Sequence, residues 1–436
     1  MTDTGKTPYF LSERAQKLVR KRYAAERRFR FYGLAMIILA LAFLAVLFYT
    51  IISQGISGFV VTNIRLPVTF TAEALGVEPG ATAEDLKGVS GFKYTKLARR
   101  SLNDYLGIPK GDTEDERLSR GLLSNGVDVQ LRKILVNDPT LLGSTVEVWL
   151  LAHGSVDPFV KGQISRDLPE NRRLINDQQM AWLEKLEHDG RVDLRFNSNL
   201  FTEGASADPE LAGVGVALLG SFFMMVLVVL LALPLGVGAA LYLEEFAPKN
   251  RFTDLVEVNI NNLAAVPSIV FGILGLAVFI NYAHLPRSAP IVGGLVLTLM
   301  TLPTVIIATR AAIRAVPPSI KEAALGVGAS KMQAVFHHVL PLAMPGILTG
   351  LIIGLAQAMG ETAPLIMVGM VAAVFDFPGS PMDPATALPV QIYIWSGLPE
   401  RGFVALTSAA IMILLAFLLT MNATAVILRK RFERRW

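Results

Sequence analysis

Long uncharged apolar runs, separated by short polar segments, fill the second half of the chain and occur once near its start. A helix needs about 20 apolar residues to cross the hydrocarbon core of a bilayer, which is ~30 Å thick. Six runs meet this requirement, and we expect each to be a transmembrane helix: residues 31–52, 212–243, 260–281, 290–309, 342–375 and 402–428. The pattern predicts an all-α membrane protein with about six transmembrane helices.

The first run, residues 31–52, has an alternative interpretation as part of a cleaved signal peptide. The basic segment before it, residues 1–30, is longer than the leader of a signal peptide, and the apolar run exceeds the usual length of about 7–15 residues. No clear cleavage site with small residues follows. We therefore expect a retained transmembrane helix preceded by a basic cytoplasmic leader.

A polar segment, residues 53–211, separates the first two apolar runs and has the mixed pattern of a small folded domain. Residues 145–151 and 192–196 alternate apolar and polar side chains, which is typical of strands. Residues 94–105 and 176–188 repeat apolar side chains at helical spacing. The pattern predicts an accessory α+β domain, followed by a transmembrane core with five helices over residues 212–436.

The positions of lysine and arginine predict the orientation of the helices, because short cytoplasmic segments of membrane proteins retain positive charge. Basic residues gather in the leader, which begins with Lys6, in the connection 310–341, and in the tail after residue 428, which includes Arg434 and Arg435. The short loops on the other side carry only Arg287 and Arg401. We expect a multi-pass membrane protein with both termini in the cytoplasm and residues 53–211 outside.

Composition narrows the function without identifying it. The chain has 436 residues, of which 52% are hydrophobic and 17% charged, and its mean hydropathy of +0.48 fits embedding in a lipid bilayer rather than an ordinary soluble protein. There is no cysteine, and the five histidines lack metal-ligand spacing. No basic stripe indicates nucleic-acid binding. We assign no catalytic residue, metal site or cofactor.

The connection 310–341 contains the most specific local signal, the string VPPSIKEAALGVGASKMQAVFHHVLPLAMPG. Two capping boxes are predicted in it, Ser319 with Glu322 and Ser330 with Gln333, since each pairs a hydroxyl residue with a side chain three positions later that can reach back. Glycines separate the two short helices, and Pro341 is expected to end the second. Two interpretations are open at this point. Either the hairpin docks on a partner, or it is a capped loop that only joins two spans.

This string resembles the EAA loop of ABC importer permeases. The matching residues are Glu322, Ala323, Ala324, Gly328, Leu340 and Pro341. His338 departs from the pattern, which has isoleucine there, and makes the contact more polar. The resemblance implies that the loop docks on an ATP-binding subunit, and the chain has no G-x-x-x-x-G-K-[ST] segment of its own to cradle nucleotide phosphates.

Further strings resemble PstA-like permeases of the phosphate-specific transport system. They are ALPLGVGAALYLEEFAP, NNLAAVPSIVFGILGLAVF, TLPTVIIATRAAIRAVPPSIKEAALGVGAS, GETAPL and LPVQIYIW, and the resemblance covers about residues 212–436. It implies the type I ABC importer permease fold and the uptake of inorganic phosphate. It also implies a PstC-like second permease, two copies of a PstB-like ATP-binding subunit and an extracytoplasmic phosphate-binding protein as partners.

Glu361 is the acidic residue deep in a predicted span, where an unpaired charge costs about 2.5–3.5 kcal/mol. Gly360 and Pro364 flank it, so the helix is expected to break there and, with Thr362, to line the translocation pathway. A carboxylate repels phosphate, so we expect Glu361 to form an ion pair, with Arg310 or with an arginine of a partner permease. A purely structural role for Glu361, and a role for Arg310 as an anchor at the membrane interface, remain alternatives.

A row of small residues, Gly346, Gly350 and Gly354, recurs at four-residue spacing and is expected to let another helix approach closely. Three other functions remain open. A membrane sensor also has a span, an outside domain and a second span, an ion-coupled transporter would not need the loop 310–341, and permeases for sulfate, molybdate or phosphonate share the fold.

Overall fold

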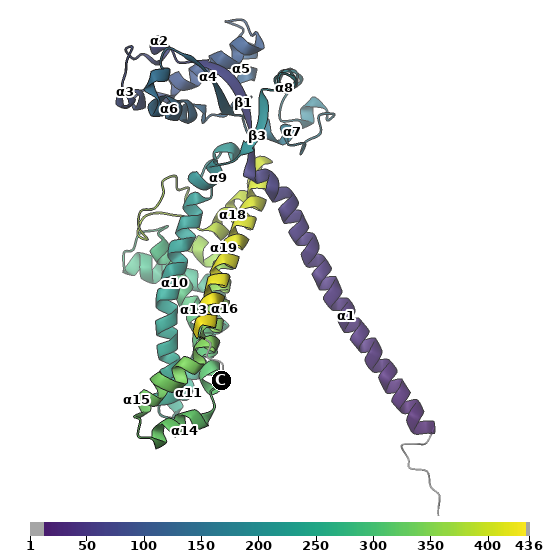
Figure 1. Cartoon of the computed structure of the whole chain (residues 1–436), viewed down its shortest axis with the longest axis vertical. Coiled ribbons are helices and arrows are strands. Elements are labelled where there is room, and N and C mark those ends of the chain that lie inside the picture. Colours follow the sequence, from purple (N-terminus) through teal and green to yellow (C-terminus); the bar gives the residue numbers. More distant parts are fainter. Residues whose placement is uncertain (1–12, 433–436) are drawn as a thin grey trace, which may run out of the picture. The chain divides into compact units, whose positions relative to one another are not determined.

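The computed structural model describes residues 13–432 and consists mainly of helices with one small sheet (Figure 1). Lys6, Arg434 and Arg435, which contributed to the predicted orientation, lie outside the described residues. The chain forms two units, residues 1–54 and residues 55–436. Within the first unit the described residues form a single helix, α1 (Glu13–Gly55), which carries the first apolar run and is long enough to cross a membrane.

A three-stranded antiparallel sheet organises the polar domain, with strand order β2-β1-β3. The strands are β1 (Val60–Thr69), β2 (Thr145–Leu151) and β3 (Val192–Phe196). The two strands predicted from alternation, β2 and β3, are confirmed. The central strand β1 was missed because it contains Pro67, which cannot donate to a ladder. Pro67 is tolerated because β3 pairs only with the first half of β1, up to Ile64.

Alternate side chains of β1 form the core of this domain. Ile64, Leu66, Val68 and Phe70 are fully buried, and helices pack over this face of the strand. The predicted helices are present as α4 (Gly91–Leu106) and α8 (Asp177–His188). The other helices of the domain are α2 (Ala72–Leu75), α3 (Ala83–Lys87), α5 (Thr113–Arg120), α6 (Val127–Asn137), α7 (Asp157–Val160) and α9 (Asn199–Thr202), with 3₁₀ turns Ile56–Phe59, Pro139–Leu141, Glu170–Arg172 and Pro209–Leu211.

The remainder of the chain forms a helical bundle. Its elements are α10 (Gly215–Leu241) with the π-helical turn η6 (Tyr242–Phe246), α11 (Arg251–Ala264), α12 (Ser268–Gly275) with η7 (Leu276–Tyr282), α13 (Pro290–Arg314), α14 (Pro318–Gly326), α15 (Lys331–Ala334) with η8 (Val335–Val339), α16 (Leu340–Gly360), α17 (Ala363–Met367), α18 (Leu388–Ser396) and α19 (Gly402–Phe432). With α1, five described helices are long and apolar enough to span a membrane, and the bent pair α11–α12 raises the number to six.

Two of the predicted spans differ from the structure. The span at residues 260–281 is not one straight helix, because α11 and α12 meet at an angle of 101°. Pro267 lies at this corner; it lacks an amide donor and disfavours helical geometry in the residue before it. The span at residues 342–375 ends at Gly360, as the expected break at Glu361 requires. The continuation to residue 375 is wrong, since only the short α17 follows.

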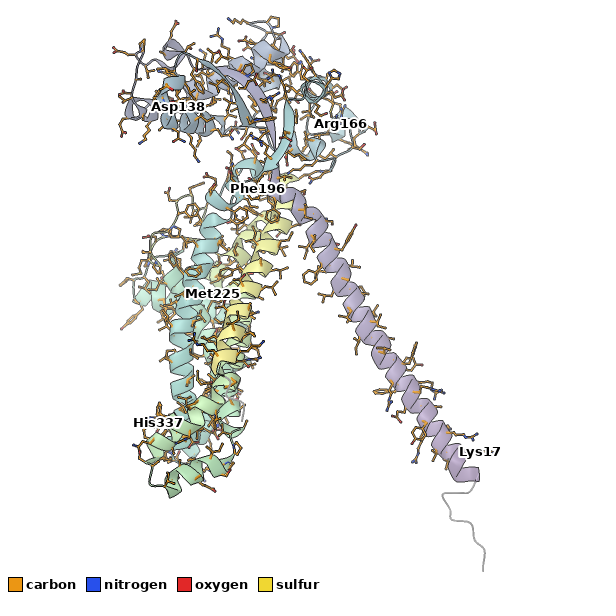
Figure 2. The ribbon with its side chains drawn as sticks, viewed as in Figure 1. Lys17, Asp138, Arg166, Phe196, Met225 and His337 are labelled. Carbon is orange, nitrogen blue, oxygen red and sulfur yellow. The ribbon has the colours of Figure 1, made fainter. Side chains whose placement is uncertain are left out.

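Helix α13 lies at the centre of the bundle and contacts α10, α11, α12 and α16. Small residues permit these close approaches. A Cβ atom added to Gly236 of α10 would lie 2.6 Å from Val305 of α13, and one added to Gly294 of α13 would lie 2.7 Å from Leu227. Met225 of α10, labelled in Figure 2, is only 3% exposed. The bundle therefore holds α13 on several sides, and the C-terminal end of α13 leads directly into the hairpin α14–α15.

Candidate functional site

The hairpin α14–α15 contains two short helices separated by a glycine in a left-handed conformation. Helix α14 ends at Gly326, and Gly328 has a φ of 90°, a value that side-chain-bearing residues rarely adopt. Ser330 then caps α15, because its hydroxyl accepts a hydrogen bond from the Gln333 amide while the Gln333 side chain accepts one from the Ser330 amide. The second predicted capping box is confirmed.

The first predicted capping box, Ser319 with Glu322, is absent. Helix α14 begins at Pro318, and the residue at its N-cap is Pro317, which makes no side-chain capping bond. Ser319 therefore lies inside the first turn, where its hydroxyl cannot occupy the capping position. A proline at the first helical position lacks the amide that a cap would satisfy, so α14 begins without a side-chain cap.

The hairpin exposes several large apolar side chains. Leu325, Val327, Met332 and Phe336 are exposed, with Val327 87% accessible, whereas Ala324 is buried. Glu322 and Ala323 lie on the exposed side of α14. Contiguous exposed apolar side chains on a monomer mark surfaces that another chain covers.

A groove with a volume of ≈ 630 Å³ lies beside the hairpin. This volume falls within the range of about 300–1,000 Å³ that is typical of ligand pockets. The walls of the groove come from the C-terminal end of α13, from α14 and from the start of α16. His337, labelled in Figure 2, and His338 line it together with Pro341. The polar His338 therefore faces this groove, next to apolar side chains such as Ile320.

Ion pairs tie the base of the hairpin to the preceding helices. Arg310 of α13 is buried, and its Nε lies 3.2 Å from Oε2 of Glu244 in η6. Its Nη2 lies 2.5 Å from Oε1 of Glu257 in α11. The other oxygen of Glu244, Oε1, accepts from Nε of Arg314 at 2.7 Å. A buried guanidinium is stable in this position because two carboxylates compensate its charge.

The same link continues onto the hairpin itself. Lys321 of α14 pairs with Glu245, the residue after Glu244, and the Nζ of Lys331 in α15 lies 5.2 Å from the ring centroid of Phe246. The turn η6 at the end of α10 therefore contacts both short helices of the hairpin. These contacts and the Arg310 ion pairs join the hairpin to α10, α11 and α13.

The acidic members of this network were missed in the sequence. Glu244, Glu245 and Glu257 are far along the chain from their basic partners, and no local spacing joins them. The available signal was the position of two adjacent glutamates directly after an apolar span, opposite Arg310 and Arg314, which share one face of a helix.

The second helix of the hairpin does not end at Pro341, which corrects the prediction. Residues Lys331–Gly360 form one continuous helical path, with the π-helical turn η8 between α15 and α16. Pro341 occupies the first turn of α16. A π turn shifts the backbone hydrogen-bond pattern by one residue, and the helix passes through the proline without a break. The path runs from the hairpin to Glu361.

At Glu361 the helix breaks as predicted. Glu361 has an extended backbone with φ −80° and ψ 126°, and α17 begins two residues later, after Thr362. Helix α17 packs on α12, where a Cβ atom added to Gly272 would lie 2.7 Å from the Cα of Pro364. Two broken helices therefore meet in the bundle, an arrangement that lines substrate pathways in other transporters.

The expected ion pair between Glu361 and Arg310 is not formed. Arg310 pairs with Glu244 and Glu257 instead, because these carboxylates lie beside the last turns of α13. The Glu361 side chain is half-buried, and within residues 13–432 its carboxylate has no hydrogen-bond or ion-pair partner. In this structure the guanidinium of Arg310 therefore joins α13 to η6 and α11 at the base of the hairpin.

The small-residue row on α16 faces α13. Added Cβ atoms at Gly346 and Gly350 would lie 2.6 Å and 2.2 Å from the Cβ atoms of Ala312 and Ala308. At Gly354 the nearest atom would be Cγ2 of Thr301, at 2.6 Å. Helices α13 and α16, which lead into and out of the hairpin, therefore approach each other closely because no large side chain separates them at these positions.

Two protein-family models match the chain. Residues 232–436 match "Binding-protein-dependent transport system inner membrane component", and residues 16–170 match "Domain of unknown function (DUF3333)". The first covers the bundle and its hairpin. The second covers α1 and most of the polar domain.

Individual proteins also match part of the chain. The "Probable ABC transporter permease protein YqgI" of Bacillus subtilis is 37% identical over 38% of this chain, and the match spans 56% of that relative's length. The "Phosphate transport system permease protein PstA 1" of Mycobacterium tuberculosis is 34% identical over 51% of this chain and 72% of its own. A solved inward-facing MetNI methionine ABC transporter is 17% identical over 50% of this chain and 97% of its own, with a TM-score of 0.42.

Proposed function

Because this chain belongs to the PstA-like inner-membrane permeases of binding-protein-dependent ABC transporters, we propose that it forms part of the path by which an ATP-driven importer takes up inorganic phosphate. The observation that carries this proposal is the hairpin α14–α15, which joins an exposed apolar surface to a buried ion-pair network. The choice of phosphate is supported by the Mycobacterium tuberculosis relative, which is a phosphate transport system permease. The alternative substrate is another oxyanion.

The hairpin is proposed to dock on an ATP-binding subunit. Its exposed apolar side chains fit a groove on a partner, and a short helix presented at the end of a bundle is a common docking element. We assign the contact to the exposed Glu322 and Ala323, to the joint at Gly328, and to the segment Leu340–Pro341. Ala324 is buried and would support this surface from below. ATP hydrolysis belongs to that partner, of which two copies would serve this chain and a second, PstC-like permease.

Coupling follows from how the hairpin is attached. One continuous helical path of 30 residues, Lys331–Gly360, leads from the hairpin to Glu361, a length of about 45 Å at 1.5 Å per residue. The Arg310 network connects the same hairpin to α10 and α11. When the ATP-binding subunits close, the hairpin moves, and this helix carries the displacement to the break, which switches the path between inward and outward opening.

Glu361 and Thr362 are proposed to line the phosphate path. The half-buried Glu361 carboxylate has no cation beside it among the described side chains. A positively charged side chain of the second permease would form an ion pair with it. Such a pair costs less than an isolated charge in the membrane and leaves the freed backbone of the broken helix to face the substrate. An external phosphate-binding protein supplies the substrate and most of the selectivity.

The orientation is also proposed. With the hairpin at an ATP-binding subunit, its side of the membrane is the cytoplasm, in agreement with the positive charge of the connection 310–341. An even number of crossings then places both termini in the cytoplasm and residues 53–211 outside as an accessory domain. The bent pair α11–α12 must count as one crossing for this to hold.

Phosphate uptake by a bacterial strain that lacks this chain tests the function. Deletion is expected to abolish high-affinity uptake of radiolabelled phosphate, and the intact chain is expected to restore it only while cellular ATP is maintained. Restored uptake that survives ATP depletion would contradict an ABC importer. Loss of sulfate uptake instead of phosphate uptake would identify a permease for another oxyanion.

A further inference from the structure

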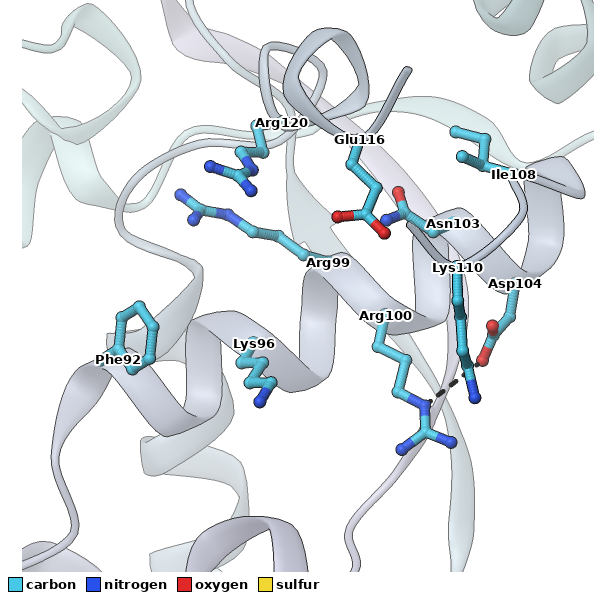
Figure 3. A pocket seen from close by; sticks show the side chains of 10 residues that line it. All are labelled: Phe92, Lys96, Arg99, Arg100, Asn103, Asp104, Ile108, Lys110, Glu116 and Arg120. Atoms are coloured by element: carbon cyan, nitrogen blue, oxygen red, sulfur yellow. Dashed lines mark ion pairs between the residues drawn. The ribbon is translucent and has the colours of Figure 1, made fainter. Parts of the chain in front are cut away.

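A pocket in the polar domain has no part in the proposed transport path. It has a volume of ≈ 420 Å³ and lies between α4, α5 and the loop that joins them (Figure 3). Its lining contains five basic side chains and two acidic ones. The basic residues are Lys96, Arg99, Arg100, Lys110 and Arg120, and the acidic residues are Asp104 and Glu116.

The sequence of α4 builds one wall of this pocket. Phe92, Lys96, Arg99 and Asn103 recur at intervals of three or four residues, so they lie on one face of the helix. The opposite face of α4 packs into the core through side chains such as Leu102. Because one face of α4 is buried in the core, its basic face points away from the core.

Arg99 and Arg120 are the unusual pair. Their guanidinium groups lie next to one another in Figure 3, and neither has an ion-pair or hydrogen-bond partner among residues 13–432. Burial lowers the pKa of Arg99, and the positive charge of Arg120 lowers it further. Two like charges held together without a counter-charge repel each other, and an anion placed between them removes that repulsion.

The neighbouring acidic side chains are already engaged elsewhere. Asp104 pairs with Arg100, with Oδ2 3.7 Å from Nε, and Oε1 of Glu116 accepts from the Gly111 amide at 3.3 Å. The hydroxyl of Ser119 donates to Oδ1 of Asn103 at 2.6 Å, which leaves the Nδ2 donor of that amide for the pocket. The pocket thus offers several donors and, with five basic and two acidic side chains, an excess of positive charge.

We propose that this pocket binds a phosphoryl oxyanion between Arg99 and Arg120, either inorganic phosphate or the phosphoryl group of a phosphomonoester. Guanidinium groups bind phosphate oxygens through paired, charge-assisted hydrogen bonds, and two of them can engage different edges of one tetrahedral anion. Asn103 supplies a further donor, and Lys96 and Lys110 add positive charge at the rim. The volume leaves room beyond the anion, beside Phe92 and Ile108, for a small organic group.

The inference concerns the accessory domain and does not depend on which solute the bundle transports. Titration calorimetry on the full chain in lipid nanodiscs, without an ATP-binding subunit, measures it with two ligands, inorganic phosphate and glycerol 3-phosphate. The test variant carries Arg99→Gln and Arg120→Gln together. The control is Arg172→Gln, which removes an exposed arginine of the same domain that does not line the pocket.

We expect wild type and the control to bind at least one of the two ligands, and the double variant to bind it about tenfold or more weakly. Binding of phosphate identifies the free anion as the ligand, and binding of glycerol 3-phosphate alone identifies a phosphomonoester. No binding of either ligand by wild type would overturn the proposal. So would equal binding by the wild type and a folded double variant, because the ligand would then occupy a different site.

Discussion

The Nε atom of Arg310 lies 3.2 Å from Oε2 of Glu244, so a buried arginine near the end of α13 is paired with a carboxylate at the end of α10. The same guanidinium reaches Glu257 in α11, at 2.5 Å. Three helices are joined by one side chain at the point where the chain enters the hairpin. In the proposed transporter, this is where a movement of the hairpin enters the bundle.

Replacing Arg310 with glutamine should loosen this junction. The variant leaves Glu257 without its partner, while Glu244 keeps Arg314. We expect the free energy of unfolding to fall by about 1–3 kcal/mol. This is below the ~3–5 kcal/mol that is typical of a broken buried ion pair, because the Glu244 carboxylate remains compensated. The thermal unfolding midpoint in detergent measures it. Arg287→Gln, at an exposed loop position, serves as the control, and an equal midpoint in the two variants would show that the network does not stabilise the fold.

Ser330→Ala should unravel the start of α15, whereas Ser319→Ala should not affect α14. Ser330 accepts a hydrogen bond from the Gln333 amide, and Ser319 caps nothing. Loss of a cap costs about 0.5–2 kcal/mol. Hydrogen exchange should therefore accelerate in a peptide covering Gln333 in the first variant alone. Equal exchange in both variants would mean that the Ser330 capping box does not hold the helix.

The buried Glu210 makes stability depend on pH. It is 3% exposed, and burial raises its pKa above the ordinary value of 4.5, with nearby Asp208 adding to the rise and the Ser124 side chain opposing it. Because the folded state holds the proton more tightly than the unfolded state, stability falls as pH rises from the unfolded pKa through the folded pKa. Above that window, folding retains a buried charge that is costly.

Glu210→Gln removes this effect. We expect the unfolding midpoint of the variant to exceed that of wild type by a margin that grows as the pH rises above the ordinary carboxyl pKa of 4.5. Thermal scans of both proteins across this range measure the difference. A margin that shrinks with rising pH would give the wrong sign, and the carboxylate would then be stabilised rather than destabilised by its surroundings.

The Glu361→Gln variant is expected to insert normally and to lower phosphate uptake about tenfold or more. A tenfold loss corresponds to a loss of ~1.4 kcal/mol of stabilisation of the open pathway. The reason is that the neutral side chain cannot pair with the cation that we assign to the second permease. Uptake per unit of membrane-inserted protein is the measurement. Glu400→Gln, an exposed acidic position before α19, is the control. Full uptake by the Glu361 variant would leave this carboxylate with only a structural role.

Sequence patterns predicted the local elements well where the physical cause is local. The alternation in residues 145–151 and the helical spacing in residues 94–105 both correspond to elements of the structure, since one face of each is buried. The proline and glycine beside Glu361 also identified the break in the helix. These signals are contained within a few consecutive residues.

Other features depend on tertiary contacts that the sequence does not display. Pro67 is compatible with a central strand only because β3 is too short to reach it. Pro341 is compatible with a continuous helix because of the π turn before it. Arg310 was one of two predicted partners for Glu361, yet the arginine pairs with Glu244, 66 residues before it in the chain. Pairing over such separations is decided by helix packing.

The joint at Gly328 tests the coupling most directly. Gly326 and Gly328 are two residues apart, and an added Cβ atom would meet nothing within 4 Å at either position. Only Gly328 has a positive φ, of 90°, where valine costs about 1–3 kcal/mol of backbone strain. Gly326→Val is therefore a matched control that adds the same side chain to the same hairpin without that strain.

The decisive measurement is ATP hydrolysis and phosphate uptake, recorded together in proteoliposomes that contain the complete transporter and its phosphate-binding protein. We predict that Gly328→Val assembles at normal stoichiometry and loses most of both activities, whereas Gly326→Val keeps most of both. Wild-type rates of hydrolysis and uptake in the assembled Gly328 variant would contradict the account, because the hairpin joint would then not transmit the movement that drives transport.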